Sequence, residues 1–448
     1  MTEDDQGALR AAGLYHIISI SGLHISLVAM FVFFTLRAAM ALFPRFALYH
    51  PIKKYAAMAA LFGTVAYMFL VGPSVPTVRS VLMMGLVLGA IMLDRVPFSM
   101  RLVAVAAMAV LVFEPESLLG PSFQMSFGAV AALIAFYEAS PALWSKLRGR
   151  GGLLREYLFV YPRGICATSI VATIATAPYS LYHFQNLALY GLIANLVALP
   201  LMGLAVMPPL VLAYLLMPLG LDGPVVWMMG KGIAGVLYIS HWVAALPLSM
   251  IHPPFWPMGA LIGFSLAGAF FMLGRGWFRA LALVPLIAAV VIILQDRPPD
   301  VFISSRGGLF AIRDEAGALH VSSFAHDRFT AQIWARMAGV PKENLVRWPK
   351  DSDDLLKCDE QGCRMEQGGR RVAFSFRPDG QAEDCGWADI LIAQNPVNKR
   401  DCRAPTVIDR FDVWRDGSHT VWLDGHVESA AMLRGQRPWA RSPGRKEN

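Results

Sequence analysis

Charge is scarce in this sequence. Only 16% of its 448 residues are Asp, Glu, Lys or Arg, whereas 56% are hydrophobic and the mean hydropathy is +0.48. Soluble globular domains carry charge on about a quarter of their residues, so this composition excludes a chain that is soluble throughout. It predicts a polytopic α-helical membrane protein.

Several common sequence features are also missing. The first residues, Met1–Asp5, have neither a basic region nor an apolar core, so they do not form a signal peptide. No string reads G-x-x-x-x-G-K-[ST], the phosphate-binding loop of many nucleotide hydrolases. No internal repeat or long low-complexity segment stands out.

The apolar residues form runs of the length that crosses a hydrocarbon core of about 30 Å. About ten spans are predicted, at 14–43, 55–72, 77–93, 101–114, 122–138, 164–182, 187–217, 224–249, 256–273 and 278–294. The run at 187–217 contains Pro200, Pro208 and Pro209, and is either one broken helix or two short ones. The predicted domains are a short extracytoplasmic lead (1–13), a transmembrane domain (14–294), a small α+β domain (295–433) and a basic disordered tail (434–448).

The basic residues orient these segments, because Lys and Arg gather in cytoplasmic loops. Basic residues follow the first, third, fifth and ninth segments, whereas the loops at 72–76, 114–116 and 183–186 have no Lys or Arg. Ten crossings then place both termini, and the whole α+β domain, outside the cytoplasm. The basic excess also lies before residue 295, with sixteen Lys or Arg against nine Asp or Glu, so the pI of about 9.2 is no argument for nucleic-acid binding.

Four of the five cysteines lie close together in the polar region. An exported domain meets oxidising conditions, so disulfides are the favoured interpretation, and three pairings are open. The alternative, a zinc site that uses His419 or His426, is less favoured because no C-x-x-C pair is present. Cys166 lies in an apolar segment and is read as a small core side chain. The candidate disulfide residues are Cys358, Cys363, Cys385 and Cys402.

The stretch His16-Ile-Ile-Ser-Ile-Ser-Gly-Leu-His24 opens the first apolar run with polar groups that a lipid-facing helix lacks. At 100° per residue, His16 and His24 lie about 80° apart on a helix, and Ser21 lies about 60° beyond His24. One inner face of a single helix is therefore expected to carry all three. They are candidates for a substrate path, and the alternative is hydrogen bonding between packed helices.

Five further polar residues in apolar surroundings are candidates for the same path. Each has a structural alternative: an ion pair or an outward-reaching side chain for the basic residues, and interhelical hydrogen bonds for the others. Arg79 is also able to hold phosphate oxygens as a bidentate donor. These candidates are Arg79, Gln124, Ser126, Asn195 and Lys231.

Five separated strings resemble one family. They are the His16–His24 stretch, Pro76-Thr-Val-Arg-Ser80, Ser122-Phe-Gln-Met-Ser-Phe127, Thr176-Ala-Pro178, and Ala194-Asn195 followed by Pro200. Their order and spacing resemble the ComEC competence family over residues 10 to 280. The resemblance implies a channel for single-stranded DNA in the bacterial inner membrane, used in natural transformation.

The resemblance also implies partners and missing parts. An extracytoplasmic DNA receptor and a cytoplasmic helicase or single-strand-binding protein are expected, together with the lipid bilayer and, as an open possibility, further copies of the chain. Family members usually have an OB-like domain before the Ser-Gly-Leu-His string, so we expect a chain shortened at its front: a genuine short form, a remnant or a misplaced start codon. Many relatives also have a metallo-β-lactamase-like domain, but no His-x-His-x-Asp-His string is present here.

The polar region reads as short strands separated by turns. Strands are expected at 301–304, 309–312, 319–321, 372–376, 390–392 and 420–423, with a helix at 329–337. This pattern suggests a reduced form of the family's C-terminal domain.

We predict no cofactor, no metal site and no catalytic residue in this chain. One alternative function is a small-solute secondary transporter, with a site formed by 187–217 and Lys231. The other is a membrane-tethered, metal-dependent hydrolase that uses His419, Asp424 and His426.

Overall fold

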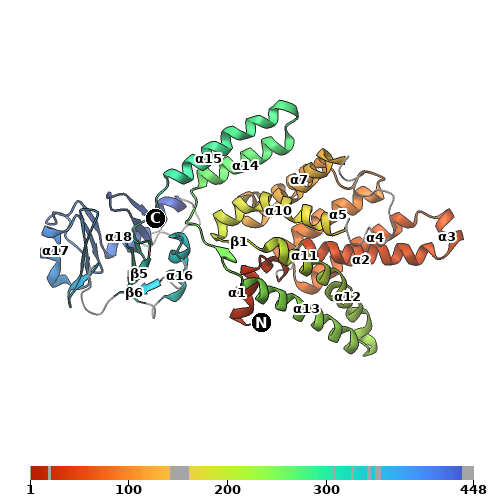
Figure 1. Cartoon of the computed structure of the whole chain (residues 1–448), viewed down its shortest axis with the longest axis horizontal. Coiled ribbons are helices and arrows are strands. Elements are labelled where there is room, and N and C mark those ends of the chain that lie inside the picture. Colours follow the sequence, from red (N-terminus) through yellow and green to blue (C-terminus); the bar gives the residue numbers. More distant parts are fainter. Residues whose placement is uncertain are drawn as a thin grey trace, which may run out of the picture. The chain divides into compact units, whose positions relative to one another are not determined.

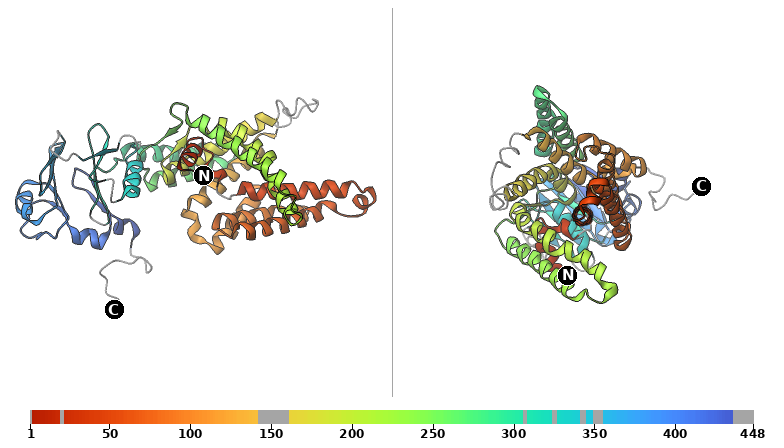
Figure 2. Two further views of the ribbon diagram at one scale, coloured as in Figure 1. Left: turned by 90° about the horizontal axis from the view of Figure 1, so that it is seen from below. Right: turned by 90° about the vertical axis from the view of Figure 1, so that its right-hand side faces the viewer.

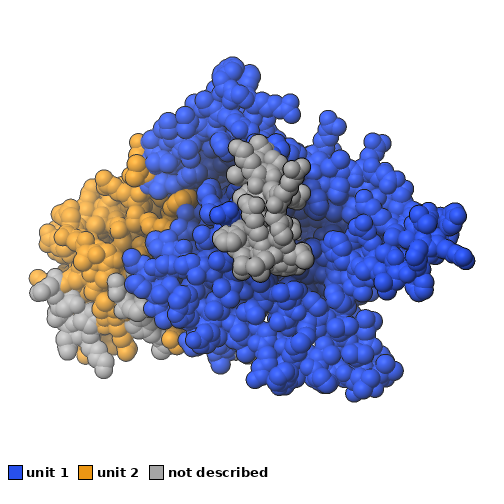
Figure 3. All heavy atoms as spheres, turned by 45° about the vertical axis from the view of Figure 1, so that its right-hand side comes forward, with its two compact units in different colours: residues 1–251, 257–293 blue, residues 252–256, 294–448 orange. Residues whose placement is uncertain are grey.

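The computed structural model describes residues 2–18, 22–141, 161–305, 308–323, 327–340, 345–348 and 355–435. The chain divides into two compact units, coloured separately in Figure 3. The helical unit comprises Met1–Ile251 and Pro257–Ile293, and the β-sheet unit comprises His252–Trp256 and Leu294–Asn448. Most of the predicted tail, 434–448, lies outside the described residues, of which Arg434 and Gly435 are the last.

The helical unit is built almost entirely from apolar helices (Figure 1). Its α-helices are α1 (Glu3–Ala11), α2 (Gly22–Ala41), α3 (Pro44–Tyr49), α4 (Ile52–Val71), α5 (Val75–Met92), α6 (Met100–Phe113), α7 (Pro121–Ala139), α10 (Tyr161–Phe184), α11 (Gly191–Leu201), α12 (Met207–Leu216), α13 (Gly223–Ala244), α14 (Met258–Leu273) and α15 (Leu283–Gln295). Short helices include η1 (Tyr15–Ile17), η2 (Pro115–Leu119), the π-helix η4 (Met202–Val206), η5 (Met217–Leu219) and η6 (Gly276–Ala282). Strands β1 (Leu187–Ala188) and β2 (Met250–Ile251) form a small antiparallel pair.

Five helical stretches among the described residues are long and apolar enough to cross a membrane. They are Gly22–Ala41, Ile52–Val71, Pro162–Phe184, Gly191–Leu219 and Gly276–Gln295. Shorter apolar helices lie at Pro76–Met92, Met100–Phe113 and Met258–Leu273. The prediction of a mainly helical chain with apolar spans is confirmed at this level, and the count of ten crossings stays a prediction.

His16 and His24 lie in different elements, so the expectation that one face of a single helix carries both is wrong. Helix α1 ends at Ala11, and Gly13 adopts a left-handed conformation with φ of 69°. This conformation, which favours glycine, ends the helix. His16 therefore lies in η1, whereas His24 lies in α2. Ser21 lies outside the described residues.

The proline-containing segment is one broken helical path. Helices α11 and α12 are joined through the π-helix η4, and Pro208 lies in the first turn of α12. A proline ring clashes with the carbonyl four residues earlier and supplies no N–H, and a π-turn absorbs this mismatch. Of the two predicted arrangements, the structure therefore has the single broken helix.

Small residues allow close packing in the helical unit. A Cβ atom at Gly232 of α13 would lie 2.8 Å from the carbonyl oxygen of Ala205 in η4, and one at Gly128 of α7 would lie 3.0 Å from the Tyr179 ring of α10. Apolar helices in a membrane approach through such residues, because lipid offers them no hydrophobic driving force. Helices α2, α4 and α5 also pack against one another, and they lie side by side in Figure 2.

The β-sheet unit consists of two packed sheets. One has the order β13-β12-β3-β4-β5-β6 and the other the order β11-β10-β9-β8-β7. Their strands are β3 (Val301–Ile303), β4 (Phe310–Arg313), β5 (Leu319–Val321), β6 (Leu345–Arg347), β7 (Lys357–Cys358), β8 (Gly362–Gln367), β9 (Arg370–Ser375), β10 (Ile390–Ala393), β11 (Thr406–Ile408), β12 (His419–Val421) and β13 (Val427–Ser429). The helices are α16 (Arg328–Met337), α17 (Gln381–Trp387), α18 (Arg410–Asp416) and α19 (Ala430–Arg434).

Side-chain alternation along the strands explains the layers. Val301 and Ile303 belong to the core between the two sheets, whereas Phe302 points the other way and packs on Trp334 of α16. On the second sheet, Ala373 and Leu391 pack with Cys385 of α17. Successive side chains of a strand face opposite sides, so each sheet is covered on both faces. The unit is a helix–sheet–sheet–helix sandwich, which confirms the predicted α+β class.

Candidate functional site

Polar side chains, some buried and some half-buried, gather at one end of the helical unit, where α5 and α7 begin and α10 ends. Arg79, one turn into α5, is only 7% exposed. Its Nη2 donates to Ser122 Oγ at 2.8 Å and to Ser126 Oγ at 3.2 Å. A buried guanidinium costs free energy unless it is paired with an opposite charge and hydrogen-bonded. A purely structural role would therefore not favour an arginine with these two neutral partners.

The two serines lie on one face of α7 because residues four apart are neighbours on a helix. Together they hold the guanidinium through neutral hydroxyls. Its Nε is buried and has no hydrogen-bond partner among the residues that the structure describes. In the part of the chain that the structure describes, no carboxylate forms an ion pair with Arg79, although Glu114 attracts it electrostatically. Within that part of the chain, the charge of Arg79 is therefore held by neutral partners alone.

Gln124 lies on a different face of α7 and connects it with α10. Its Nε2 donates to the carbonyl oxygen of Leu118 at 3.0 Å, and its Oε1 lies 2.8 Å from His183 Nε2. The first two turns of α7 therefore make polar contacts with α5, η2 and α10.

The start of α2 lies beside the same end of α5. A Cβ atom at Gly22 would lie 3.5 Å from Ser80 Oγ, which itself donates to the carbonyl oxygen of Pro76 at 2.7 Å. His24 is buried in α2 at 7% exposure. The strings around Gly22, Arg79 and Ser122 are thus brought together by the fold although they lie far apart in the sequence.

Four of the predicted path residues that the structure describes are not part of this set: His24, described above, and three more. His16 Nδ1 is 3.1 Å from the carbonyl oxygen of Gly13, which is a local contact. Asn195 of α11 has a buried Oδ1 without a hydrogen-bond partner among the described residues. Lys231 is exposed on α13, with Nζ 5.5 Å from the centroid of the Trp227 ring, while the adjacent Gly232 is buried against η4.

The cluster thus contains Arg79, Gln124 and Ser126 of the predicted residues, and it adds Ser122 and His183. Ser122 was quoted only as part of a string, although its spacing of four from Ser126 signals a shared face. His183 carries no such signal in the sequence, where it lies at the start of a loop without Lys or Arg. Its pairing with Gln124 depends on how α7 packs against α10, which the sequence pattern alone does not give. Below, this set of five is called the Arg79 cluster.

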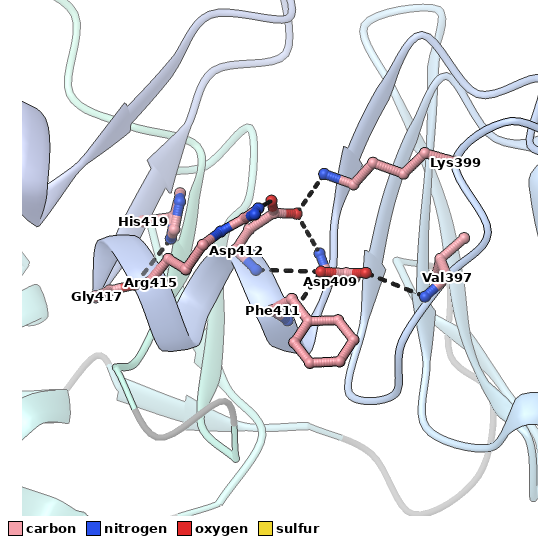
Figure 4. A network of polar contacts seen from close by, with 8 residues as sticks. All are labelled: Val397, Lys399, Asp409, Phe411, Asp412, Arg415, Gly417 and His419. Carbon is pink, nitrogen blue, oxygen red and sulfur yellow. Dashed lines mark hydrogen bonds and ion pairs between the residues drawn. The ribbon is translucent and has the colours of Figure 1, made fainter. Parts of the chain in front are cut away.

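Polar groups in the β-sheet unit form a closed network (Figure 4). The Asp409 carboxylate accepts hydrogen bonds from the backbone N–H groups of Val397, Phe411 and Asp412. Burial raises the pKa of Asp412, but the Asp409 N–H and the Lys399 ammonium outweigh it and hold this pKa below its ordinary value. These acids cap and anchor α18.

The histidines proposed for a hydrolase do not converge. His419 Nδ1 lies 2.9 Å from the carbonyl oxygen of Gly417, and burial lowers the pKa of His419. His426 Nε2 is 3.5 Å from Glu428 Oε1. Across the described ranges, no group of three or more His, Cys, Asp or Glu side chains is placed to hold a metal ion.

The structure pairs the clustered cysteines as Cys358–Cys363 and Cys385–Cys402. The first bond joins the neighbouring strands β7 and β8, and the second fixes α17 to the segment before β11. Cys166 of α10 forms no disulfide and is half-buried.

Apolar helices with a small polar cluster at one end define a helical membrane protein. A sequence profile described as "Competence protein" matches residues 1–278, which is more than half of the chain. The chain belongs to the competence protein family, and this confirms the resemblance seen in the five strings.

Individual relatives match only part of their own length. The chain is 33% identical to "Competence protein ComA" of Neisseria gonorrhoeae over 193 residues, which are 43% of this chain and 25% of that protein. It is 23% identical to "ComE operon protein 3" of Bacillus subtilis over 213 residues, 47% of this chain and 24% of that protein. It is 26% identical to "Recombination protein 2" of Haemophilus influenzae over 232 residues, 51% of this chain and 28% of that protein. No solved structure matches the chain.

Proposed function

We propose that this chain is a component of the channel that carries single-stranded DNA across the bacterial inner membrane during natural transformation. Membership of the competence protein family supports a role in DNA uptake. The observation that carries the proposal further is the Arg79 cluster, in which one buried guanidinium and four half-buried polar side chains lie at one end of an otherwise apolar bundle. Polar groups at membrane depth commonly line a wet path for a polar substrate.

The chemistry of the cluster fits a mobile polyanion. A DNA strand carries one negative charge per nucleotide and cannot enter hydrocarbon, so its path needs water, hydrogen bonds and modest positive charge. Serine hydroxyls, an amide and an imidazole offer weak contacts that a moving strand can exchange. Arg79 adds one positive charge rather than a dense basic lining.

The proposal includes a multi-pass arrangement with about ten crossings and an extracytoplasmic β-sheet unit. The basic loops at 45–54 and 95–101, and Arg275 with Arg279, would then lie in the cytoplasm. The Arg79 cluster adjoins the loops at 72–76 and 114–120, which have no Lys or Arg, so it would lie at the outer end. The two disulfides agree with an oxidising environment for the β-sheet unit.

The partners are part of the proposal too. An extracytoplasmic receptor would present the DNA, and a cytoplasmic helicase or single-strand-binding protein would draw the strand inward. The sequence contains no P-loop string, so the energy would come from such a partner. His16, His24, Asn195 and Lys231 remain proposed path residues outside the Arg79 cluster.

Deletion of the gene in a transformable host tests the function. We expect DNA to bind at the cell surface as before, while labelled single strands no longer reach the cytoplasm and transformants fall to background. A copy in trans should restore both. Unchanged internalisation in the deletion strain would contradict the proposal. A reporter that needs the periplasm, fused after residue 294, should be active, and a signal only from a cytoplasmic reporter would reverse the orientation.

A further inference from the structure

The Arg79 side chain is an incompletely satisfied buried cation. Both hydrogen bonds to the serines come from Nη2, while Nε is buried without a partner among the described residues. Hydroxyl acceptors are neutral, so they position the guanidinium but leave its charge available. An anion with two oxygens would satisfy the guanidinium far better than the serines do.

Helix ends add to the positive character of this place. Helices α5 and α7 both begin beside Arg79, and neither has a capping side-chain hydrogen bond at its N-terminus; Pro76 and Pro121 each remove one N–H group, and the others of the first turns are left to bind a ligand. The N-terminus of α2 adjoins α5 at Gly22 and Ser80. Helix N-termini carry partial positive charge and unpaired N–H groups, and they are ready sites for phosphate oxygens.

Glu114 limits the strength of the site. It ends α6 and attracts Arg79 electrostatically, without a direct ion pair. A carboxylate at a distance lowers the affinity for an anion without occupying the guanidinium, so the anion can bind and leave. Weak, reversible binding is what passage requires.

We propose that Arg79, together with the first turns of α5 and α7, forms a binding site for one phosphodiester group of the DNA strand. This inference rests on the proposed function, because it names the group of the substrate that the Arg79 cluster contacts. Ser122 and Ser126 hold the guanidinium in place when no strand is present and give way to phosphate oxygens when a strand passes.

The test measures binding of a twelve-nucleotide oligo-dT to the full chain in nanodiscs of zwitterionic lipid. Arg79→Gln should weaken binding roughly 10-fold to 100-fold, as expected for the loss of a charge-assisted hydrogen-bonding group. Arg79→Lys should restore part of the loss. The matched control is Arg37→Gln, which removes one positive charge from the exposed surface of α2. Its affinity should equal that of the wild type.

Two further measurements make the test specific. An oligonucleotide with neutral methylphosphonate linkages should bind the wild type and Arg79→Gln equally. Glu114→Gln should tighten the binding of native oligo-dT roughly twofold to fivefold, a change that a misfolded protein would not produce. Equal affinity of the wild type and Arg79→Gln for native oligo-dT would overturn the site.

A lipid phosphate is the other source of the same chemistry. If Arg79→Gln lowers the retention of phosphatidylglycerol but leaves oligo-dT affinity unchanged, the ligand is a headgroup and the inference is overturned. Uptake assays in cells distinguish failure of the phosphodiester site from failure of the proposed channel function. Loss of uptake in the deletion strain, with normal uptake by Arg79→Gln, would remove only the phosphodiester site, whereas normal uptake in the deletion strain would remove the channel role itself.

Discussion

Asp409 and Arg79 are both buried charged groups, and the two units treat them differently. In the β-sheet unit, Asp409 accepts three backbone N–H groups, and its neighbour Asp412 is paired with Lys399 and Arg415. In the helical unit, Arg79 donates hydrogen bonds to two serine hydroxyls, and its buried Nε has no partner among the described residues. A closed network stabilises its own fold, whereas an open one has capacity left for a ligand. Of these two charged groups, Arg79 is therefore the one that has capacity left for a ligand.

The largest expected effect comes from breaking the core of the β-sheet unit. Phe374 is fully buried between the sheets, 5.0 Å from the Trp348 ring and 5.7 Å from the Phe310 ring, measured between centroids. Phe374→Ala should lower the free energy of unfolding of this unit by about 3–5 kcal/mol. Hydrogen exchange of the full chain should show the loss in β9 and β10 and leave α2 and α4 unchanged.

Phe411→Ala is the control for that substitution, because Phe411 is 53% exposed. It should change stability by less than about 0.5 kcal/mol. Equal losses from Phe374→Ala and Phe411→Ala would mean that the two sheets do not pack around Phe374.

The next largest effects are expected from the two disulfides, which both stabilise the β-sheet unit. Replacing Cys385 and Cys402 with serine opens a loop with a sequence separation of 17 and should cost about 3 kcal/mol. Replacing Cys358 and Cys363 opens a separation of 5 and should cost about 2 kcal/mol. Mass spectrometry of non-reduced peptides checks the pairing first, and a peptide that links Cys358 to Cys385 would contradict it.

The sequence predicted much of the β-sheet unit because its central strands are short apolar runs bounded by turn residues. All six predicted strands are present, and the predicted helix at 329–337 is α16. The weaker strands β6 to β8, β11 and β13 were missed, since polar residues such as Arg364 and Glu366 of β8 interrupt their pattern. Cysteine spacing alone left three pairings open, and only the register of β7 and β8 brings Cys358 opposite Cys363.

The candidate site was harder to predict, because helix starts and helix contacts decided it. The projection of His16 and His24 onto one helix failed because His16 lies in the short η1 and His24 lies in α2. Arg79 and Ser126 come from strings 47 residues apart, and only the packing of α5 on α7 joins them. Polarity in an apolar run picked out Arg79, Gln124 and Ser126, but it did not tell which polar side chains meet.

A smaller effect is expected within the polar end of the helical unit. Gln124 and His183 join α7 to α10, and a double-mutant cycle with Gln124→Leu and His183→Leu should give a coupling of about 0.6 kcal/mol, the typical value for such pairs in membranes. Detergent-induced unfolding of the full chain measures it. Strictly additive effects would show that this hydrogen bond contributes nothing.

The smallest effect concerns pH at the edge of the helical unit. The Thr2 backbone N–H and the His241 ring lower the pKa of Asp5 to about 2. Because this pKa is lowered, the ionised carboxylate stabilises the contact of α1 with α13 above pH 4, and the gain is lost as the pH falls towards 2. Hydrogen exchange in α1 should therefore rise in that range for the wild type, relative to Asp5→Asn. An identical pH response of both proteins would remove Asp5 from this contact.

The most direct test of the account asks whether a passing strand touches the Arg79 cluster. A photocrosslinking amino acid is placed at Ser126, and another at Ile174 of α10, which is 68% exposed, as the control. Cells are illuminated during uptake of labelled DNA. We predict crosslinks to single-stranded DNA from position 126 and none from position 174. Active uptake without any crosslink from position 126 would contradict a strand path through this end of the bundle.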